Sequence, residues 1–243
     1  MDAETSQWMA DLAAATGRLL GTAGALTDAG VREPSLLPGW TRGHVLTHIA
    51  RNADGLANLL RWAQTGIETP MYASAEARAA AIEAGAGRPA AELAADVAAA
   101  ADAFAGQATG LPAQAWTAQV RRLTGPPFPA YGVLQLRLSE VEIHHVDLAA
   151  GYRPGDWPDD FVTDALARVA DSFAGRQDTP ACVVWAAGSG ARFRIGPDRP
   201  AAAPTLVHGP AATLLAWLTG RDGGSGLQVF GDDPTLPVPP AWR

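Results

Sequence analysis

Residues 139–148 read SEVEIHHVDL and carry three acids and two imidazoles, in a chain of 243 residues that has only 5 histidines. In an α-helix, side chains four residues apart lie on the same face, with their Cβ atoms about 5–6 Å apart. Glu140 and His144 would therefore point the same way. Such a pair also arises by chance on solvated helices, so its spacing alone is compatible with an ordinary polar face or with one half of a metal site.

A second stretch, GWTRGHVLTHIARN at residues 39–52, places His44 and His48 in the same four-residue relation. Two facing helices could then combine imidazole from one helix with the carboxylate and imidazole of the other. Two histidines and one carboxylate leave a coordination position open on zinc, as catalytic rather than structural zinc sites do. The same donors suit iron and other first-row metals, so the pattern favours a metal without fixing its identity.

The first 150 residues have a helical pattern, with Ala/Leu-rich segments separated by short Pro/Gly breaks. The pattern predicts a helix that contains Leu12 and ends near Gly30, one from its N-cap Thr41 to about Ala63, a short one capped by Ser74 that ends at Gly85 or Gly87, one over 88–108 opened by Pro89, and one over 131–150. Four of these helices are long, which favours an antiparallel four-helix bundle over residues 1–150. Such bundles build metal sites from inward side chains of facing helices.

The composition changes at GYRPGDWPDD, residues 151–160, which we interpret as a linker. Beyond it, residues 161–243 mix element types and predict a small α/β domain. The expected elements are a helix near 160–175, strands over 181–187 and 191–196, a helix over 210–220 and a strand over 227–230. The closing segment 234–243 contains too many prolines for regular structure. The expected fold is therefore mostly α, with an N-terminal bundle and a smaller C-terminal α/β domain.

The charge balance restricts the classes of partner. A formal net charge of -7 and a pI near 5.1 provide no basic surface for nucleic acid or for an anionic membrane. The first twenty residues contain three acids and lack the pattern of a signal peptide, and no apolar run is long enough to span a bilayer. We therefore expect a cytoplasmic protein with neither of these partners.

Two features of the composition limit the chemistry. Cys182 is the only cysteine, which excludes an internal disulfide and a thiolate-based metal cluster, and its place in ACVVW (181–185) predicts a buried strand residue rather than a catalytic thiol. All 18 basic residues are arginine. Without lysine the protein forms no Schiff base of its own, and arginine is its only fixed side-chain cation at neutral pH.

Four stretches carry a family resemblance. They are LLPGWTRGHVLTHIARNADGLANLLRWAQTGIETPMYASAEAR (36–78), RLSEVEIHHVDLAAG (137–151), WLTGRDGGSG (217–226) and PVPPAW (237–242). Together they resemble the mycothiol-dependent maleylpyruvate isomerases, whose N-terminal domain belongs to the DinB-like metal-binding bundles. The GWTRGHVLTHIARN and RLSEVEIHHVDL blocks are together quite specific to mycothiol-linked proteins, and TGIETPMYASAEAR (65–78) favours the isomerase itself.

The resemblance implies a set of site residues. His48, Glu140 and His144 correspond to the family's metal ligands, usually of zinc, with water in the open position. Arg78 and Arg221 match positions of the isomerase pattern, and we expect them to contact the substrate or its enolate, because the guanidinium fork binds carboxylate in a bidentate manner. On position alone, Arg78 could also lie on a solvated helix face, and Arg221 could be a charge favoured at a helix end.

Three neighbouring residues have open roles. His44 lies one turn before the implied ligand His48, either as a cap-region or pocket residue or with a direct role. His145 lies about 100° round the helix from His144, which suits a surface or interhelix position. Asp147 follows His144 by three residues, where it could hold that ligand or a neighbouring helix as an acceptor, or form an ordinary helix-end ion pair.

The activity that the resemblance implies is the mycothiol-dependent cis–trans isomerisation of maleylpyruvate to fumarylpyruvate, as in gentisate-type aromatic degradation. A thiolate adds to the alkene of this dianionic substrate, the resulting single bond rotates, and elimination leaves the trans product. Because Cys182 is expected to be buried, the thiol must come from outside the chain, and the resemblance implies that it is mycothiol. A divalent metal such as zinc would lower the pKa of that thiol. Two alternatives remain: another mycothiol-dependent thiol transferase that acts on electrophiles, and a non-catalytic metal-containing binding protein.

Overall fold

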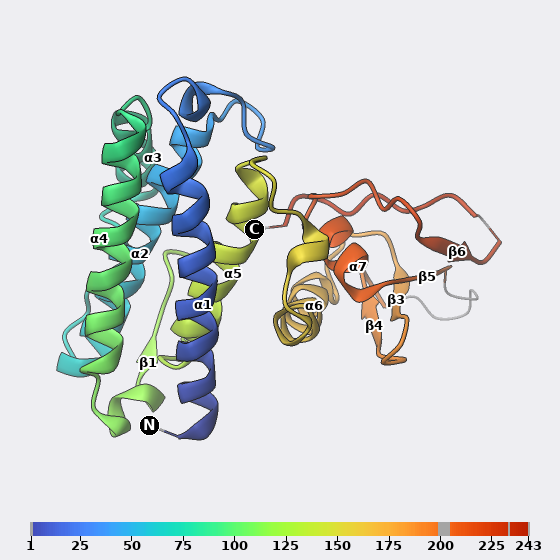
Figure 1. Ribbon diagram of the computed structural model, residues 1–243. Coiled ribbons are helices and arrows are strands. Elements are labelled where there is room, and N and C mark those ends of the chain that lie inside the picture. Colours follow the sequence, from blue (N-terminus) through green and yellow to red (C-terminus); the bar gives the residue numbers. More distant parts are fainter. Residues whose placement is uncertain (1, 199–204, 233, 243) are drawn as a thin grey trace. The chain divides into compact units, whose positions relative to one another are not determined.

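The computed structural model describes residues 2–198, 205–232 and 234–242 (Figure 1). The chain is mostly helical and has a smaller, strand-containing C-terminal part. It divides into two compact units, Met1–Gly151 and Tyr152–Arg243. Within the described ranges, no helix combines the length and the apolar character that crossing a membrane requires.

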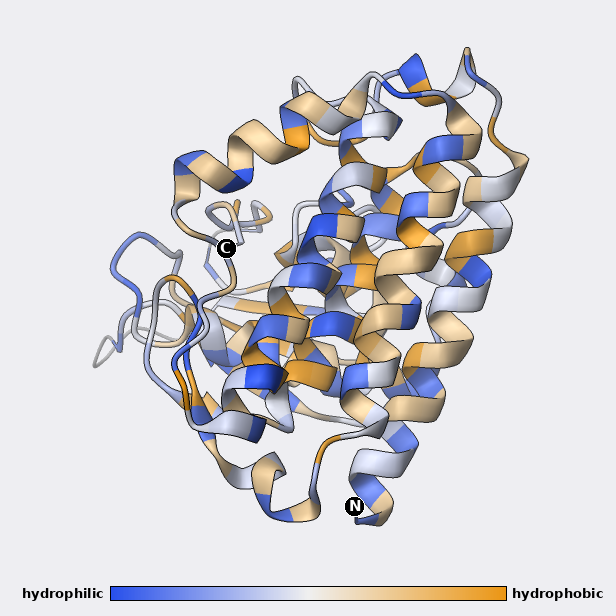
Figure 2. Cartoon of the chain, turned by 90° about the vertical axis from the view of Figure 1, so that its left-hand side faces the viewer, coloured by the Kyte–Doolittle hydropathy of each residue, from blue (hydrophilic) through white to orange (hydrophobic). Residues whose placement is uncertain are grey.

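Four long helices make up most of the N-terminal unit: α1 (Ala3–Ala25), α2 (Arg42–Thr65), α4 (Ala90–Thr109) and α5 (Gly132–Asp147). α2 packs against α4 and α5, and α1 packs against the same two helices, so the four lie side by side (Figure 1). Hydrophilic and hydrophobic residues are interleaved along these helices (Figure 2). The apolar ones meet in a core that includes Leu19, Ile49, Leu60, Leu93, Phe104 and Leu134, all of them buried.

Shorter elements join the long helices. α3 (Ala75–Ala86) lies against α2, and η2 (Ala113–Thr117) leads into an antiparallel pair of two-residue strands, β1 (Gln119–Val120) and β2 (Phe128–Pro129). The sequence pattern did not predict this pair, because two-residue strands are too short to show alternation of polar and apolar residues. The predicted short helix after Ser74 is present as α3.

Local capping signals define the starts of α2 and α3. Thr41 accepts a hydrogen bond from the backbone N–H of His44, and Ser74 accepts one from the backbone N–H of Ala77, as their positions predicted. The cap of α2 is reciprocal, because the His44 side chain accepts in turn from the backbone N–H of Thr41 at 3.1 Å. The imidazole of His44 is therefore committed to the helix start.

Two helices are shorter than the pattern predicted. α1 ends at Ala25 rather than near Gly30, and the chain then forms the separate 3-10 turn η1 (Gly30–Arg32). The hydroxyl of Thr27 accepts a hydrogen bond from the Gly30 backbone N–H at 3.1 Å, a local alternative to the helical bond. α5 ends at Asp147, and Ala149 then adopts a positive φ of 50° that a right-handed helix does not allow.

The C-terminal unit combines two helices with a mixed sheet. Its elements are η3 (Pro154–Asp156), α6 (Asp159–Phe173), β3 (Cys182–Ala186), β4 (Arg192–Ile195), β5 (Thr205–Gly209), α7 (Ala211–Leu218) and β6 (Gln228–Phe230). The strand order is β4-β3-β5-β6, with β3 and β5 parallel and the other two pairs antiparallel. The sequence pattern missed β5, which lies between β3 and β6 in the sheet. Cys182 is buried in β3, as predicted.

Two glycines allow α3 to lie close to the start of α2. A Cβ atom on Gly43 would collide with the backbone carbonyl oxygen of Ala86, and one on Gly85 would lie 2.5 Å from Cγ2 of Thr47. No ordinary side chain fits at either position without a shift of backbone or of a packed neighbour. This contact sets the position of α3, which carries Arg78.

We expect Gly43→Ala to destabilise the N-terminal unit by about 1–3 kcal/mol, because the added methyl group must displace the end of α3. Gly21→Ala, inside α1 with nothing within 4 Å of the added carbon, is the matched control and should stabilise the unit by about 1 kcal/mol through helix propensity. Urea unfolding followed by circular dichroism measures both. Equal effects of the two substitutions would contradict the close approach.

Candidate metal centre

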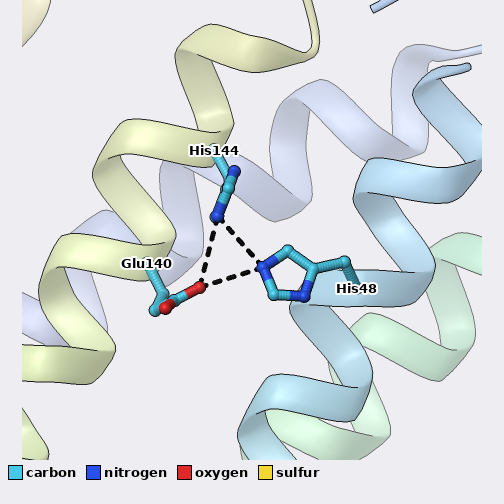
Figure 3. Close-up of side chains that lie close together, drawn as sticks. All are labelled: His48, Glu140 and His144. Atoms are coloured by element: carbon cyan, nitrogen blue, oxygen red, sulfur yellow. Dashed lines mark hydrogen bonds and ion pairs between the residues drawn. The ribbon is translucent and has the colours of Figure 1, made fainter. Parts of the chain in front are cut away.

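Two helices bring three side chains with metal-ligand chemistry to one point (Figure 3). His48 projects from α2, and Glu140 and His144 project from successive turns of α5. Nε2 of His48 lies 3.0 Å from Oε2 of Glu140 and 3.0 Å from Nε2 of His144, and these last two atoms are 3.3 Å apart. The three residues form a group whose donor atoms all lie within 4.8 Å of one another.

The separations between these donor atoms fit a small divalent ion. Bonds of about 2.0–2.1 Å in a tetrahedral arrangement place neighbouring ligand atoms about 3.3 Å apart. The observed separations of 3.0, 3.0 and 3.3 Å lie close to that value. Two imidazole nitrogens and one carboxylate oxygen suit zinc and also iron, so the donor set fits a metal ion without selecting one.

Asp147, the last residue of α5, orients His144. Its Oδ2 atom lies 2.7 Å from Nδ1 of His144, and its side chain is fully buried. A carboxylate accepts at this contact, so Nδ1 carries the hydrogen, and in the neutral imidazole Nε2 of His144 presents its lone pair to the shared point. The structure therefore shows one of the roles predicted for Asp147, that of an acceptor that holds His144. Such a carboxylate also raises the basicity of the imidazole that it orients.

Arg78 reaches His48 from the other side. Its Nη2 atom lies 3.1 Å from Nδ1 of His48. A guanidinium only donates, so Nδ1 is the acceptor and the neutral imidazole carries its hydrogen on Nε2, from which it donates to Glu140 or His144. A metal ion would bind the lone pair of Nε2, so the hydrogen of His48 would have to lie on Nδ1. The Nδ1–H group would then face the N–H donor of Arg78. The Arg78 contact and metal binding by His48 are thus mutually exclusive.

Burial and hydrogen bonding separate the pKa values of the three residues. Burial, together with the charges of His144 and Arg78, lowers the pKa of His48 to about 4 despite its bond to Glu140. Burial alone would raise the pKa of Glu140, but hydrogen bonds from the protonated form of His144 and from His48 hold it well below its usual value. Burial likewise opposes protonation of His144, and the bonds to Asp147 and Glu140 outweigh it, so the pKa is raised.

Comparison with known proteins assigns this arrangement to a family. Residues 12–149 match the family model of the mycothiol maleylpyruvate isomerase N-terminal domain, and residues 156–237 match the model of the C-terminal domain of the same proteins. The chain belongs to the mycothiol-dependent maleylpyruvate isomerase family. This confirms the resemblance found in the sequence, and family membership makes the protein an enzyme.

Two solved structures are similar to this member of the isomerase family. One is the crystal structure of the mycothiol-dependent maleylpyruvate isomerase, and the other is a mutant of that isomerase in which alanine replaces a histidine. Each has a TM-score of 0.90 and 28% sequence identity, and the match covers 98% of this chain and 97% of the other. A search of curated protein sequences found no significant match.

The two arginines that the isomerase pattern singled out lie in different units. Arg78 is on α3 and contacts His48, which places it beside the candidate metal centre. Arg221 follows α7 in the C-terminal unit, where its Nη1 atom donates to the backbone oxygen of Thr219 at 2.6 Å. The side chain of Arg221 is partly buried. Its contact with substrate stays a prediction.

The other two histidines near the centre have structural contacts. Nε2 of His44 lies 3.2 Å from Oε2 of Glu83 on α3, and its Nδ1 caps α2, which agrees with the cap-region role among its alternatives. His145 is buried, and its Nε2 lies 2.7 Å from the hydroxyl of Thr22 on α1. His145 is therefore an interhelix residue, as one of its predicted alternatives had it.

Sequence reasoning missed three residues next to this family site. Arg137, one turn before Glu140, is buried and donates from Nη1 to Asn52 and to the backbone oxygen of Ile49 on α2. Tyr72 precedes α3 and has a buried hydroxyl. Asn52 follows His48 by four residues and so shares its helix face, which could have indicated the pair of Asn52 and Arg137. Nothing local in the sequence marks Tyr72.

We expect His48→Ala to lose most of its bound metal, because two ligands remain where three converge. His44→Ala, one turn earlier on the same helix and outside the group, is the matched control and should retain its metal. Elemental analysis of both purified variants, with circular dichroism to check folding, measures the difference. Full metal occupancy in a folded His48→Ala protein would remove this residue from the ligand set.

We expect Arg78→Met to bind metal about tenfold more tightly than the wild type, because the substitution removes both the competing hydrogen bond to His48 and a nearby positive charge. Asp147→Asn should change affinity in the opposite direction by about 10–100-fold, since it weakens the acceptor that orients His144. Competition with a chromogenic chelator measures both dissociation constants. Weaker binding in Arg78→Met would show that Arg78 supports the metal-bound form.

Proposed function

We propose that this protein is a mycothiol-dependent isomerase that converts maleylpyruvate to fumarylpyruvate, and that His48, Glu140 and His144 hold a divalent metal ion, preferably zinc. The convergence of their donor atoms within 4.8 Å carries the proposal, in a chain whose two parts match the two family models. The proposal includes an antiparallel DinB-like bundle for the four long helices. Its partners are a dianionic small-molecule substrate and mycothiol.

The reaction requires temporary loss of a double bond. A thiolate attacks the alkene carbon, a C–S bond forms, and the displaced electron pair becomes an enolate on the neighbouring carbonyl group. The former double bond then rotates as a single bond. When the enolate electrons return, the C–S bond breaks, the trans alkene forms and the thiolate leaves unchanged. The thiol is therefore regenerated, and substrate and product have the same atoms.

The thiol must come from outside the chain. Burial raises the pKa of Cys182 to about 12, so this cysteine stays a protonated thiol in its strand at neutral pH. Mycothiol, named in the matched structures and family model, supplies the nucleophile in our proposal. A bound zinc ion would lower the pKa of a thiol at its remaining position.

The chain's own residues prepare the site for this chemistry. His144 is held by Asp147 in the tautomer with a free Nε2 lone pair, and Glu140 is kept ionised by its hydrogen bonds. The substrate's two carboxylates and the enolate require cations, which in a chain without lysine are arginines. We assign this task to Arg78 beside His48 and to Arg221.

We expect Arg221→Ala to lower kcat/KM for maleylpyruvate by roughly 10–100-fold with unchanged metal content, because a charge-assisted contact to the substrate is lost. Arg176→Ala is the control in the same unit, since this arginine pairs with Asp178 on the surface and should not affect turnover. Loss of maleylpyruvate absorbance in the presence of mycothiol measures both rates.

A panel of electrophiles assayed beside maleylpyruvate tests the reaction itself. Mycothiol-dependent isomerisation of maleylpyruvate by the wild type supports the proposal. Conjugation of the electrophiles to mycothiol without conversion of maleylpyruvate would instead identify a thiol transferase with the same metal and thiol. An unchanged rate in Arg221→Ala would remove that arginine from the site without affecting the proposal for the metal centre.

A further inference from the structure

Tyr72 has a buried hydroxyl that makes no hydrogen bond of good geometry with any residue that the structure describes, although Arg78 lies near enough to it to favour ionisation of the phenol. Buried polar groups are normally hydrogen-bonded, and each exception requires an explanation. Tyr72 is half-buried, and a hydroxyl at the surface could be satisfied by water at little cost, but this hydroxyl is buried near Glu140 and Arg78 of the candidate metal centre. The missing partner is therefore the observation to explain.

The close approach of α2 fixes the position of the ring. A Cβ atom on Gly55 would lie 3.2 Å from Cζ of Tyr72, the carbon that bears the hydroxyl, and 3.1 Å from the backbone oxygen of Met71. Gly55 follows His48 by seven residues, about two helical turns, so the two share a face of α2. The hydroxyl end of Tyr72 is thus held against the same face of α2 as His48.

Two guanidinium groups, those of Arg78 and Arg137, lie near enough to this hydroxyl to act on its pKa. Cζ of Arg78 lies 5.8 Å from the centroid of the Tyr72 ring. Nη2 of Arg137 is also buried without an acceptor among the described residues. Glu140, the carboxylate whose charge acts on both Tyr72 and Arg137, already bonds through Oε2 to His48 and His144. Two guanidinium donors beside a phenol hydroxyl suit an anionic oxygen.

The protonation state of the Tyr72 phenol and the cavity beside it are both compatible with an anionic ligand. Burial raises the pKa of Tyr72, so the phenol remains a neutral donor at neutral pH. The same residue and Arg78 line a cavity of about 220 Å³, together with the ion pair of Arg51 and Asp54 and with apolar residues of α2 and α3. A small carboxylate in that cavity would lie next to both residues.

We propose that Tyr72 is a substrate-binding residue, whose hydroxyl donates a hydrogen bond to an anionic oxygen of the substrate that Arg78 also contacts. The oxygen belongs to a substrate carboxylate or to the enolate that forms on the neighbouring carbonyl group when the thiolate adds to the alkene. Gly55 serves as a positioning residue, since it allows the ring to reach this place. The inference rests on the proposed function for the identity of the substrate, and on the structure alone for the anion.

The test compares Tyr72→Phe with Tyr131→Phe in metal-loaded, full-length protein. Tyr131 lies in the same unit, is 37% exposed and stacks on Trp8, so loss of its hydroxyl should change nothing. We expect Tyr72→Phe to raise KM for maleylpyruvate and the dissociation constant for fumarate about tenfold, because a hydrogen bond to a charged group is lost. Metal content and thermal midpoint should match the wild type.

Calorimetry with fumarate and with its neutral isostere fumaramide separates binding of the anion from the reaction. Tyr72→Phe should bind fumarate more weakly than the wild type does, and its affinity for fumaramide should be unchanged. If the wild type does not convert maleylpyruvate, the proposed function fails, and the fumarate result still decides the role of Tyr72. Equal fumarate affinity in wild type and Tyr72→Phe, or no binding of fumarate by the wild type at millimolar concentration, would overturn the inference.

Discussion

The candidate centre depends on the register between α2 and α5, because its three donor atoms come from positions 92 and 96 residues apart in the chain. A slip of one helical turn moves a side chain by about 5.4 Å, which is more than the separation between these atoms. Arg137 prevents such a slip by donating from α5 to the Ile49 backbone and to Asn52 on α2, at 2.8 and 3.0 Å. A second tie lies at the other end, where the Leu36 backbone N–H donates to the carbonyl oxygen of Asp147.

Burial of the Arg137 guanidinium, which links α5 to α2, is energetically unfavourable, and the position of this residue explains why it is nevertheless charged. Burial lowers the pKa of this guanidinium to about 10, because a charge inside the unit is poorly solvated. A hydrophobic pair of similar volume would often be as stable. Only a charged donor of this length, however, both reaches the α2 backbone and adds positive potential one turn from Glu140. Stability alone therefore does not account for the residue, whereas alignment of the centre does.

The sequence predicted features that follow from short-range rules and missed those that depend on packing. Capping by Thr41 and Ser74 and the shared face of Glu140 and His144 follow from spacing within a few residues. β5 was missed because its five residues acquire their identity from pairing with β3 and β6 rather than from alternation. Family resemblance, not spacing, selected His48 over His44. The cap bond of His44 gives the physical reason, since that imidazole is already committed to the helix start.

Arg78 connects the metal chemistry with the anion chemistry through the two nitrogens of one imidazole. His48 can give its Nε2 lone pair to a metal ion only when Nδ1 carries the hydrogen, and in that tautomer it offers Arg78 no acceptor. A guanidinium that leaves Nδ1 keeps its charge at any physiological pH and requires another acceptor. The nearby Tyr72 hydroxyl can accept a hydrogen bond from Arg78, but it has no acceptor of good geometry for its own hydrogen among the described residues. An incoming carboxylate would satisfy both donors at once, so a metal-loaded centre would favour an anionic substrate.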